Sequence, residues 1–404
     1  MKARFNGNFT QQLPIPEEGI ERAVEIMRSG RLHRYNVVAD EVPETVRLEQ
    51  AFADYMGVEF CLACTSGGYA LQTALRAYGV AAGEPVLTNG FTLSPVPGSI
   101  SAAGAKPVLV EITDQLVIDL EDLRRKADDS GARILMLSHM RGHIADMDAL
   151  TSLTDQIGLA VIEDCAHTMG AHWKGARSGS HGVAACFSVQ TYKHINSGEG
   201  GFITSNDAEL MARATLLSGS YMLYGRHHNV PADEVFERVR LTTPNCSGRM
   251  DNLRAAILRP QLAQLDELVE SWNERYRAVE AGLRSRNGIV LRERPPAEHF
   301  VGSSIQFRID TLEDAEIEAF IDACLACGVE LKWFGGAEPV AYTSRYDSWQ
   351  YLDAQKLPVT DRILSRLFDM RIPLTFSVED CELIAQIICQ CVDEVRGVHT
   401  SKAS

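Results

Sequence analysis

One lysine of the chain, Lys193, has a sequence setting that favours nucleophilic chemistry. It follows the apolar segment Phe187–Val189 and precedes a glycine-rich turn at residues 198–201. Burial and nearby positive charge lower the pKa of an amine, which gives the neutral nucleophile that Schiff-base formation needs. A single lysine is more often a solvated surface residue, so this interpretation depends on the residues that accompany Lys193.

A carboxylate suited to the same chemistry is Asp164, which directly follows the apolar run Leu159–Glu163. A carboxylate at a buried strand end is costly unless it is paired. A pyridinium N–H would be such a partner, and the carboxylate would keep that nitrogen protonated and the ring a better electron sink. The alternative interpretation is that Asp164 caps a helix.

A third element is the turn Thr65–Leu71, which is predicted to follow a strand and to open a helix. Its small residues would let backbone N–H groups approach a phosphate, and the helix N-terminus would favour an anion. A purely structural turn is the alternative. Ligands of open α/β sheets bind outside the carboxyl ends of the strands, where these elements are predicted to lie.

The elements that would position these residues are visible as a repeating pattern. Short apolar runs alternate with helical patterns from about residue 57 to 205, which is typical of βα units around a mostly parallel sheet. Successive apolar residues suggest strands that are buried on both faces. The predicted strands are 58–64, 84–88, 107–112, 133–137 and 159–163.

The C-terminal part of the chain is predicted to form a second domain. Pro260 is expected to begin a long connecting helix over residues 261–286, because proline fits the first turn of a helix. Helix and strand signals then alternate to about residue 396. We therefore expect a large domain in residues 1–260, including an N-terminal segment, and a connecting helix with a smaller domain in residues 261–404.

Composition narrows the class of protein. The 404 residues carry a formal net charge of −15, which argues against a nucleic-acid surface. Residues 1–16 lack an apolar signal core, and no run of about 18 apolar residues appears, so we expect a soluble cytoplasmic protein without a membrane segment. For the CxxC pairs Cys61/Cys64 and Cys324/Cys327, buried thiols are favoured over a metal or redox site.

Together these features make the chain resemble the DegT/DnrJ/EryC/StrS family of aminotransferases, often called sugar aminotransferases, which depend on pyridoxal 5′-phosphate (PLP). The resemblance runs from about Gly30 to Leu374. It rests on the motifs Leu48–Phe52, Ser66-Gly67, Gly104–Val108, Ala145–Asp148, Glu163–His167, Phe187-Ser188, Lys193, Gly198–Gly201, Gly248–Met250 and Ile372–Leu374. It implies an α/β fold, the type I fold of PLP-dependent transferases. In that fold a mostly parallel sheet flanked by helices forms the large domain, and a smaller α/β domain follows.

The family pattern implies catalytic roles for three residues. Lys193 would carry PLP as a Schiff base and move the proton between the substrate and the cofactor. Asp164 would pair with the pyridine nitrogen, and His167 would lie near the phenolic oxygen of the cofactor.

The same pattern implies further cofactor contacts. The turn at Gly67, Gly68 and Tyr69 and the hydroxyl of Ser188 would hold the phosphate. Phe91 would stack on the ring, with an ordinary core aromatic as the alternative.

The chain departs from the family pattern at positions that bear on the substrate and on the neighbouring subunit. Ser247 replaces an Asn that often reaches the phosphate of the other subunit, and Asn245 lies two residues earlier, so both are candidate cofactor contacts. Arg141 could bind a substrate carboxylate or phosphate through two hydrogen bonds, or be a surface residue. His143 and Arg249 are further candidates for substrate binding.

A loop at residues 220–229 varies within the family. It contains Arg226, His227 and His228 and is expected to line the pocket of the adjacent subunit. A solvated loop is the alternative interpretation.

The resemblance implies a homodimeric aminotransferase with shared active sites. Such an enzyme would move an amino group from glutamate or glutamine to a keto-sugar, a nucleotide-linked keto-sugar or a related cyclic ketone. One alternative is another PLP reaction, such as dehydration, decarboxylation or oxidation; relatives that dehydrate sugars replace the lysine by His, whereas Lys193 is retained here. A non-catalytic PLP-binding regulatory protein is the second alternative, and the acidic charge counts against it.

Overall fold

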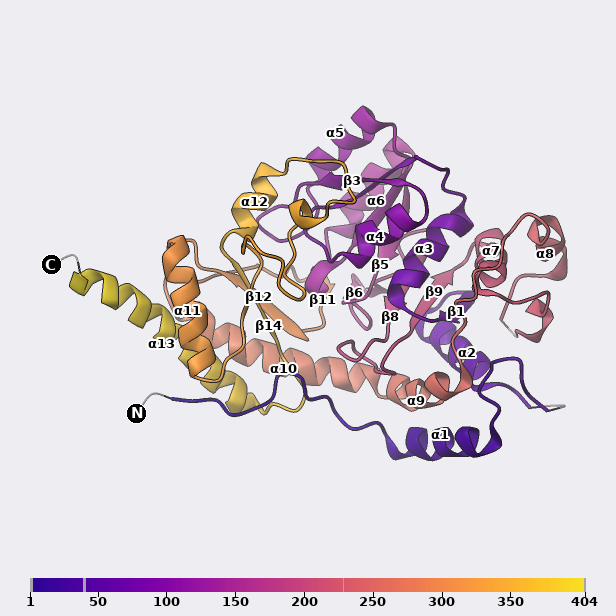
Figure 1. Cartoon of the computed structure of the whole chain (residues 1–404), viewed down its shortest axis with the longest axis horizontal. Coiled ribbons are helices and arrows are strands. Elements are labelled where there is room, and N and C mark those ends of the chain that lie inside the picture. The colour runs from indigo at the N-terminus through magenta and orange to yellow at the C-terminus, as the bar shows by residue number, and fades with distance from the viewer. Residues whose placement is uncertain (1–2, 39–40, 228, 403–404) are drawn as a thin grey trace.

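A seven-stranded sheet forms the centre of the computed structural model, which describes residues 3–38, 41–227 and 229–402 (Figure 1). Only β9 runs antiparallel to its neighbours in this sheet, as far as the described residues show. In spatial order the strands are β1 (Phe60–Cys64), β9 (Gly201–Ser205), β8 (Ala184–Ser188), β5 (Ala160–Asp164), β4 (Ile134–Ser138), β2 (Pro85–Asn89) and β3 (Lys106–Val110).

Helices cover both faces of this sheet, as the fold class predicts. One face packs against α2 (Glu44–Met56), α5 (Leu120–Ser130), α6 (Met147–Ile157) and α9 (Asn252–Ala263). The other face packs against α3 (Gly67–Tyr78), α4 (Pro95–Ala102) and α7 (Ala208–Ser218). The predicted α/β architecture, with a mostly parallel sheet flanked by helices, is therefore confirmed.

The strands predicted from apolar runs occur within two residues of their expected bounds, and they are buried on both faces. In β4, Leu135 and Leu137 belong to one core cluster, whereas Ile134 and Met136 belong to the cluster on the opposite face. This division follows from the alternation of side chains along a strand. The two thiols of the CxxC pair in β1 are likewise buried on opposite faces.

The connecting helix begins later than predicted. Pro260 lies inside α9, and the next helix is α10 (Leu265–Arg284). The expected helix start at Pro260 is therefore wrong, and the expected domain boundary between residues 260 and 261 falls within α9. Pro260 lies in the interior of this helix, where it lacks the N–H that would donate to the carbonyl four residues earlier.

Helix α10 joins the two hydrophobic cores of the molecule. Leu265, Val269 and Trp272 pack in the core of the large sheet, whereas Tyr276 and Leu283 pack in the core of the smaller unit. Figure 1 shows this long helix running beneath both units. One continuous helix therefore fixes the position of the smaller unit relative to the large one.

The smaller unit is a four-stranded antiparallel sheet that packs against helices. Its strands, in spatial order, are β10 (Val290–Leu291), β12 (Ser304–Arg308), β14 (Leu367–Arg371) and β13 (Lys332–Trp333), and its helices include α11 (Asp314–Ala326) and α13 (Val378–Lys402). Phe5 and Phe9 also belong to this core, and both contact the ring of Phe376 edge-on. The N-terminal segment, which was expected in the large domain, thus packs with the smaller unit.

The remaining elements are short or peripheral. They are α1 (Glu17–Ser29), α8 (Asp233–Val239), α12 (Pro358–Leu364), the 3₁₀ turns η1 (Met140–Gly142), η2 (Tyr224–Arg226) and η3 (Tyr346–Ser348), and a three-stranded sheet of β11 (Glu298–His299), β6 (His172–Trp173) and β7 (Ala176–Arg177). Among the described helices, none combines the length and the apolar composition that crossing a membrane requires.

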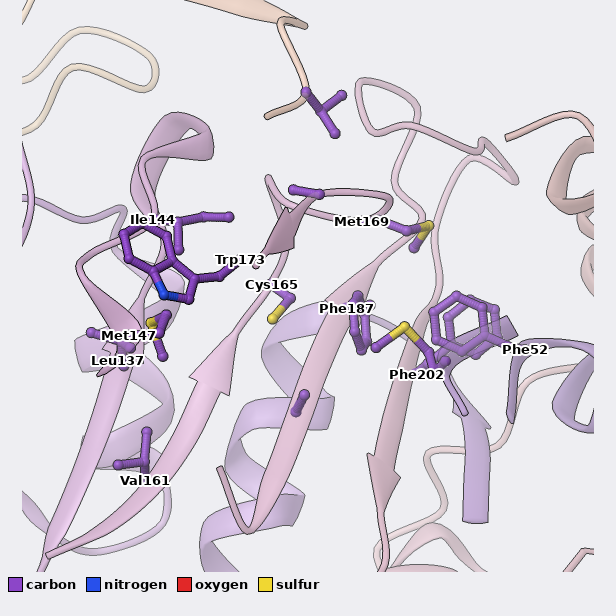
Figure 2. Packing of buried hydrophobic residues seen from close by; sticks show 14 of the residues in the cluster. Phe52, Leu137, Ile144, Met147, Val161, Cys165, Met169, Trp173, Phe187 and Phe202 are labelled. Carbon is purple, nitrogen blue, oxygen red and sulfur yellow. The ribbon is translucent and has the colours of Figure 1, made fainter. Parts of the chain in front are cut away.

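Phe52 is an aromatic anchor of the large core. Its ring stacks on Phe202 at a centroid distance of 4.3 Å and meets Phe187 edge-on at 5.0 Å (Figure 2). The Phe52→Ala variant is expected to lose about 3–5 kcal/mol of unfolding free energy, because a large buried cavity would remain. Urea denaturation measures this loss. Leu325→Ala, at a side chain that is 57% exposed, is the control and should change stability by less than about 0.5 kcal/mol; equal effects would contradict the prediction.

Candidate active site

The first turn of α3 and the end of β8 form one wall of the site. Ser66 caps the helix through its side-chain oxygen. Gly67 is required by close packing, because a Cβ atom there would lie 2.8 Å from Cβ of Ser188, and a Cβ on Gly201 would lie 2.6 Å from the Ser66 carbonyl oxygen. Gly67, Gly68 and Ser188 line one cavity. N–H groups in a first helical turn lack intrahelical acceptors, so this wall suits an anion such as a phosphate.

Tyr69 has a different environment from the expected one. Its N–H donates to Oγ of Ser66 at 3.1 Å, and its hydroxyl donates to the carbonyl of Leu217 at 3.0 Å. Tyr69 is absent from the described residues that line the cavity. The amide predicted to hold a phosphate therefore already has an acceptor within the helix cap.

Asp164 is the last residue of β5 and lines the same cavity. Its Oδ2 accepts a hydrogen bond from Ser138 at 3.0 Å, and Ser138 in turn accepts one from Thr92 at 2.7 Å. Its Oδ1 accepts the N–H of Ala166 at 3.1 Å, but a turn follows rather than a helix, so the helix-cap alternative is wrong. Burial raises the pKa of Asp164, although the hydrogen bond from Ala166 and the charge of Lys193 oppose this shift.

The neighbouring carboxylate, Glu163, is fully buried, but both of its oxygens have hydrogen-bond partners. It accepts hydrogen bonds from the amides of Gly179, His181 and Gly182 at 2.8–3.0 Å, and its Oε2 lies 3.0 Å from Nε2 of His139. Burial alone would raise the pKa of Glu163, but the bonds from His139 and His181 lower it overall. Glu163 therefore fastens the loop before β8 to β5 and supports the strand end that carries Asp164.

Lys193 lies between β8 and β9, as predicted, and faces His167. Its Nζ is 2.8 Å from Nε2 of His167. Burial and the charges of Lys193 and Arg141 hold the pKa of His167 well below its usual value, so the imidazole is neutral. A neutral ring can accept a hydrogen bond at Nε2 from the lysine amine, which orients that amine.

The amine of Lys193 titrates far from its usual range. Burial is the largest cause, and the charges of Arg141 and Arg371 add to it, while Asp164 acts in the opposite direction; together they lower the pKa to about 7. Much of the lysine is therefore the neutral nucleophile near neutral pH. The alternative of an ordinary solvated surface lysine is wrong.

Two cavities meet at this lysine. The larger, about 340 Å³, is lined by the α3 turn, Asp164, Ser188, and residues of the smaller unit near Tyr342. The second, about 90 Å³, is lined by Arg141, Arg371 and Ser303 among others. Among the described residues, Lys193 and His167 alone line both cavities.

The residues of the larger cavity fit PLP. Asp164 is a buried carboxylate in the cavity lining, its pKa is raised by burial, and a pyridinium N–H would supply a counter-charge. The glycine turn and Ser188 suit the phosphate, and Lys193 is an amine of lowered pKa. These groups occur in one cavity of a size typical for small-molecule sites.

Phe91 does not reach this cavity. It is 2% exposed and packs edge-on against Phe334 at 5.1 Å in a separate core cluster. Leu93, two residues later, lines the cavity in its place. The ring-stacking role predicted for Phe91 is therefore not supported, because that part of the chain directs Phe91 into the core. No sequence signal distinguishes Leu93 from Phe91, since residues two apart share a face in an extended segment.

The two candidates for substrate binding in η1 have different positions. Arg141 is buried and lines the second cavity, so the surface alternative is wrong. His143 is also buried, but it is absent from the described residues that line either cavity. Burial, with the charges of Arg292 and Arg294, keeps the pKa of His143 well below its usual value. The geometry therefore favours Arg141 and gives no access to His143.

Arg371 was missed by the sequence analysis. It ends β14 and lines the second cavity. Its only sequence signal is its place directly before the motif Ile372–Leu374, which the family resemblance already included.

The residues expected to reach a second subunit form a group that does not line either cavity. Asn245 and Ser247 are exposed, and the N–H of Ser247 donates to the Asn245 side chain at 3.0 Å. Arg249 donates to the carbonyl of Gly219 at 2.8 Å and lies 5.0 Å from the ring centre of Tyr221. Their predicted cofactor and substrate roles therefore require a neighbouring chain.

The loop at 220–229 is partly packed rather than fully solvated. Tyr221 is exposed, but Tyr224 and His227 are buried. Nε2 of His227 lies 2.7 Å from the Tyr35 hydroxyl, and Nδ1 lies 2.9 Å from the guanidinium of Arg34. His228 lies outside the described residues. The buried histidine therefore anchors the loop to the large unit.

Comparisons with known proteins agree with this architecture. The model of the DegT/DnrJ/EryC1/StrS aminotransferase family matches residues 15–389. The crystal structure of 3-amino-5-hydroxybenzoic acid synthase superimposes with a TM-score of 0.80 at 25% identity, over 97% of this chain and 100% of that one.

Two curated relatives match part of the chain. GDP-perosamine synthase from Caulobacter vibrioides is 37% identical over 55% of this chain. L-glutamine:2-deoxy-scyllo-inosose aminotransferase from Streptomyces fradiae is 33% identical over 63% of it. These matches span 57% and 60% of the relatives' own lengths.

The lowered pKa of Lys193 has a measurable consequence. In protein freed of cofactor, acylation of Lys193 by acetic anhydride should increase as pH rises through about 7, because deprotonation releases the nucleophile. Lys174 is the control: a hydrogen bond from its amine to Asp148 raises its pKa. Peptide mass spectrometry across pH reports both sites. Titration of Lys193 in the same range as Lys174 would contradict the proposed environment.

Proposed function

The chain belongs to the DegT/DnrJ/EryC1/StrS aminotransferase family, and on this premise we propose that it is a PLP-dependent aminotransferase. It moves an amino group from glutamate or glutamine to a keto-sugar, a nucleotide-linked keto-sugar or a related cyclic ketone. The single observation that carries the proposal is the position of Lys193, whose amine has a pKa lowered to about 7 and adjoins both cavities. The names of the two curated relatives, a perosamine synthase and an inosose aminotransferase, support an acceptor of this class.

Each residue of the larger cavity has a defined task in this proposal. When bound, PLP supplies an aldehyde for covalent attachment and a ring that accepts electron density from the substrate α-carbon. Asp164 keeps the pyridine nitrogen protonated, and the α3 turn with Ser188 anchors the phosphate. Lys193 holds the cofactor and moves a proton, while His167 orients the lysine amine at 2.8 Å.

The second cavity provides the space for the substrate. It shares Lys193 and His167 with the larger cavity, so an amine or ketone bound there would lie beside the lysine. The same lysine amine would then be close to both the cofactor and the substrate. A single residue that carries a proton between them must occupy such a position.

We also propose a homodimer. The group formed by the exposed Tyr221, Asn245 and Ser247 and the half-buried Arg249 offers polar atoms that do not line the cavities of this chain. A second copy related by a two-fold axis would place the group at a shared interface.

The attachment site of the cofactor can be identified chemically. Borohydride treatment of the holoenzyme should fix the cofactor permanently to Lys193, because its amine is the nucleophile nearest the proposed ring site. Peptide mapping by mass spectrometry finds the labelled residue, and Lys193→Ala provides the matched unlabelled sample. A label on another lysine of the wild-type protein would reject the assignment.

The Asp164 charge is expected to control turnover rather than phosphate binding. Asp164→Asn should lower kcat by about 10²-fold or more, because the pyridine nitrogen would lose its anionic partner. Cofactor content, measured after gel filtration, should fall far less. Ser138→Ala, which removes the hydrogen-bond donor to Asp164 and the acceptor of Thr92 but keeps the carboxylate, is a milder control. Wild-type kcat in Asp164→Asn would exclude the proposed role.

A further inference from the structure

The second cavity has a strongly one-sided charge. Its lining includes Lys193, Arg141 and Arg371, and the described residues of this lining include no Asp or Glu. Uncharged polar groups, such as Ser303 and Ser304, complete the polar part of its surface. A small cavity with this set of side chains favours an anion over a neutral ligand.

Arg141 has hydrogen-bonding capacity that the chain itself leaves unused. The residue is 7% exposed, and its Nε and one terminal nitrogen, Nη2, have no hydrogen-bond partner. That Nη2 lies 2.8 Å from Oδ2 of Asp369, but this is an ion pair without hydrogen-bond alignment. The backbone of Arg141 is also left-handed, with φ at 55°, a conformation uncommon for a residue with a side chain.

Arg371 approaches the same cavity from the smaller unit. Its guanidinium lies 3.7 Å from the ring centre of Tyr192, the residue directly before Lys193. An aromatic face holds an arginine in place without occupying its N–H groups. The guanidinium is therefore positioned and still able to donate.

The local charge is not balanced by the protein. Asp369 is the carboxylate paired with Arg141, and its other oxygen accepts from Gln306 at 2.8 Å. Lys332 adds a further cation, whose pKa is lowered to about 8; burial is the largest cause, the charges of Arg141 and Arg371 add to it, and Asp369 opposes it. Asp369 thus pairs with Arg141 and also acts on Lys332.

We propose that Arg141 and Arg371 together bind a carboxylate of the substrate in the second cavity, beside Lys193. The inference rests on the proposed aminotransferase function and adds a chemical feature of its substrate. Paired N–H donors of a guanidinium match the geometry of a carboxylate. A cavity of about 90 Å³ suits that group better than a nucleotide diphosphate. The carboxylate belongs either to the amino-acid donor or to an acidic keto acceptor.

Because the two arginines belong to different units, the bound carboxylate would link them. Arg141 follows β4 of the large sheet, and Arg371 ends β14 of the smaller one. Binding would then favour the arrangement in which both units enclose Lys193.

The test uses holoenzyme with Arg141→Gln, Arg371→Gln and Arg371→Lys, and Arg362→Gln as the control. Arg362 is exposed, pairs with Asp114 and is absent from the linings of both cavities. The donor arm follows single-turnover half-reactions with L-glutamate and L-glutamine by cofactor absorbance. The acceptor arm measures binding of D-glucuronate and of its neutral amide by calorimetry. Cofactor absorbance and circular dichroism verify that each variant is folded.

A donor carboxylate predicts that both Gln variants lower kcat/KM with both amino acids by about 10- to 150-fold, the range expected for a charge-assisted bidentate contact. An acceptor carboxylate predicts the same loss in D-glucuronate affinity, with the neutral amide unchanged and donor rates retained. Arg371→Lys should recover only part of the loss, because lysine lacks the planar fork.

Wild-type values in both arms for Arg371→Gln would overturn the inference, even if Arg141→Gln fails to fold. A loss in only one of two folded Gln variants would also overturn joint binding. Absence of any donor half-reaction in the wild-type holoenzyme would instead refute the aminotransferase function, while the calorimetric arm would still report on the arginine pair.

Discussion

Desolvation of the Lys193 amine is the constraint on which the rest of the site depends. A buried ammonium is costly, so the surroundings must either neutralise it with an anion or tolerate the neutral amine. Here burial and the nearby Arg141 and Arg371 favour the neutral amine, and Asp164 acts in the opposite direction, so that the pKa is lowered to about 7. Much of the lysine is therefore a neutral amine, the form that reacts as a nucleophile. The fold must also hold the neighbouring arginines close to this amine.

Two adjacent carboxylates on β5 show how the fold separates structural from chemical roles. Side chains alternate along a strand, so Glu163 and Asp164 face different surroundings. Glu163 is saturated by backbone amides and His139, and its pKa is lowered. Asp164 is less fully satisfied, and burial raises its pKa. Two like groups with pKa values shifted in opposite directions are typical of functional sites. The satisfied carboxylate holds the strand end rigid, and the other is left available to a cofactor.

The two-unit architecture explains why the cavities meet where they do. The carboxyl ends of β4, β5 and β8 bring Ser138, Asp164 and Ser188 to one edge of the large sheet, where ligands of such sheets bind. Helix α10 contributes to both cores and so fixes the smaller unit against this edge. The end of β14 then delivers Arg371 beside Tyr192. Most residues proposed to contact the cofactor thus belong to the large unit, whereas both units contribute residues to the proposed substrate cavity.

The sequence alone determined the strands, the fold class, the family, and the local settings of Lys193 and Asp164, because alternation, apolar runs and short motifs are properties of neighbouring residues. It could not determine that Pro260 lies within a helix, since tertiary packing of α9 overrides the local preference of proline for a helix start. Nor could it distinguish Phe91 from Leu93, or find Arg371, because which side chains line a cavity depends on contacts between distant segments. Only the tertiary structure brings the end of β4 close to β14, so that Arg141 and Arg371 line the same cavity. The burial and positive charge of these two residues give the substrate cavity its preference for an anion.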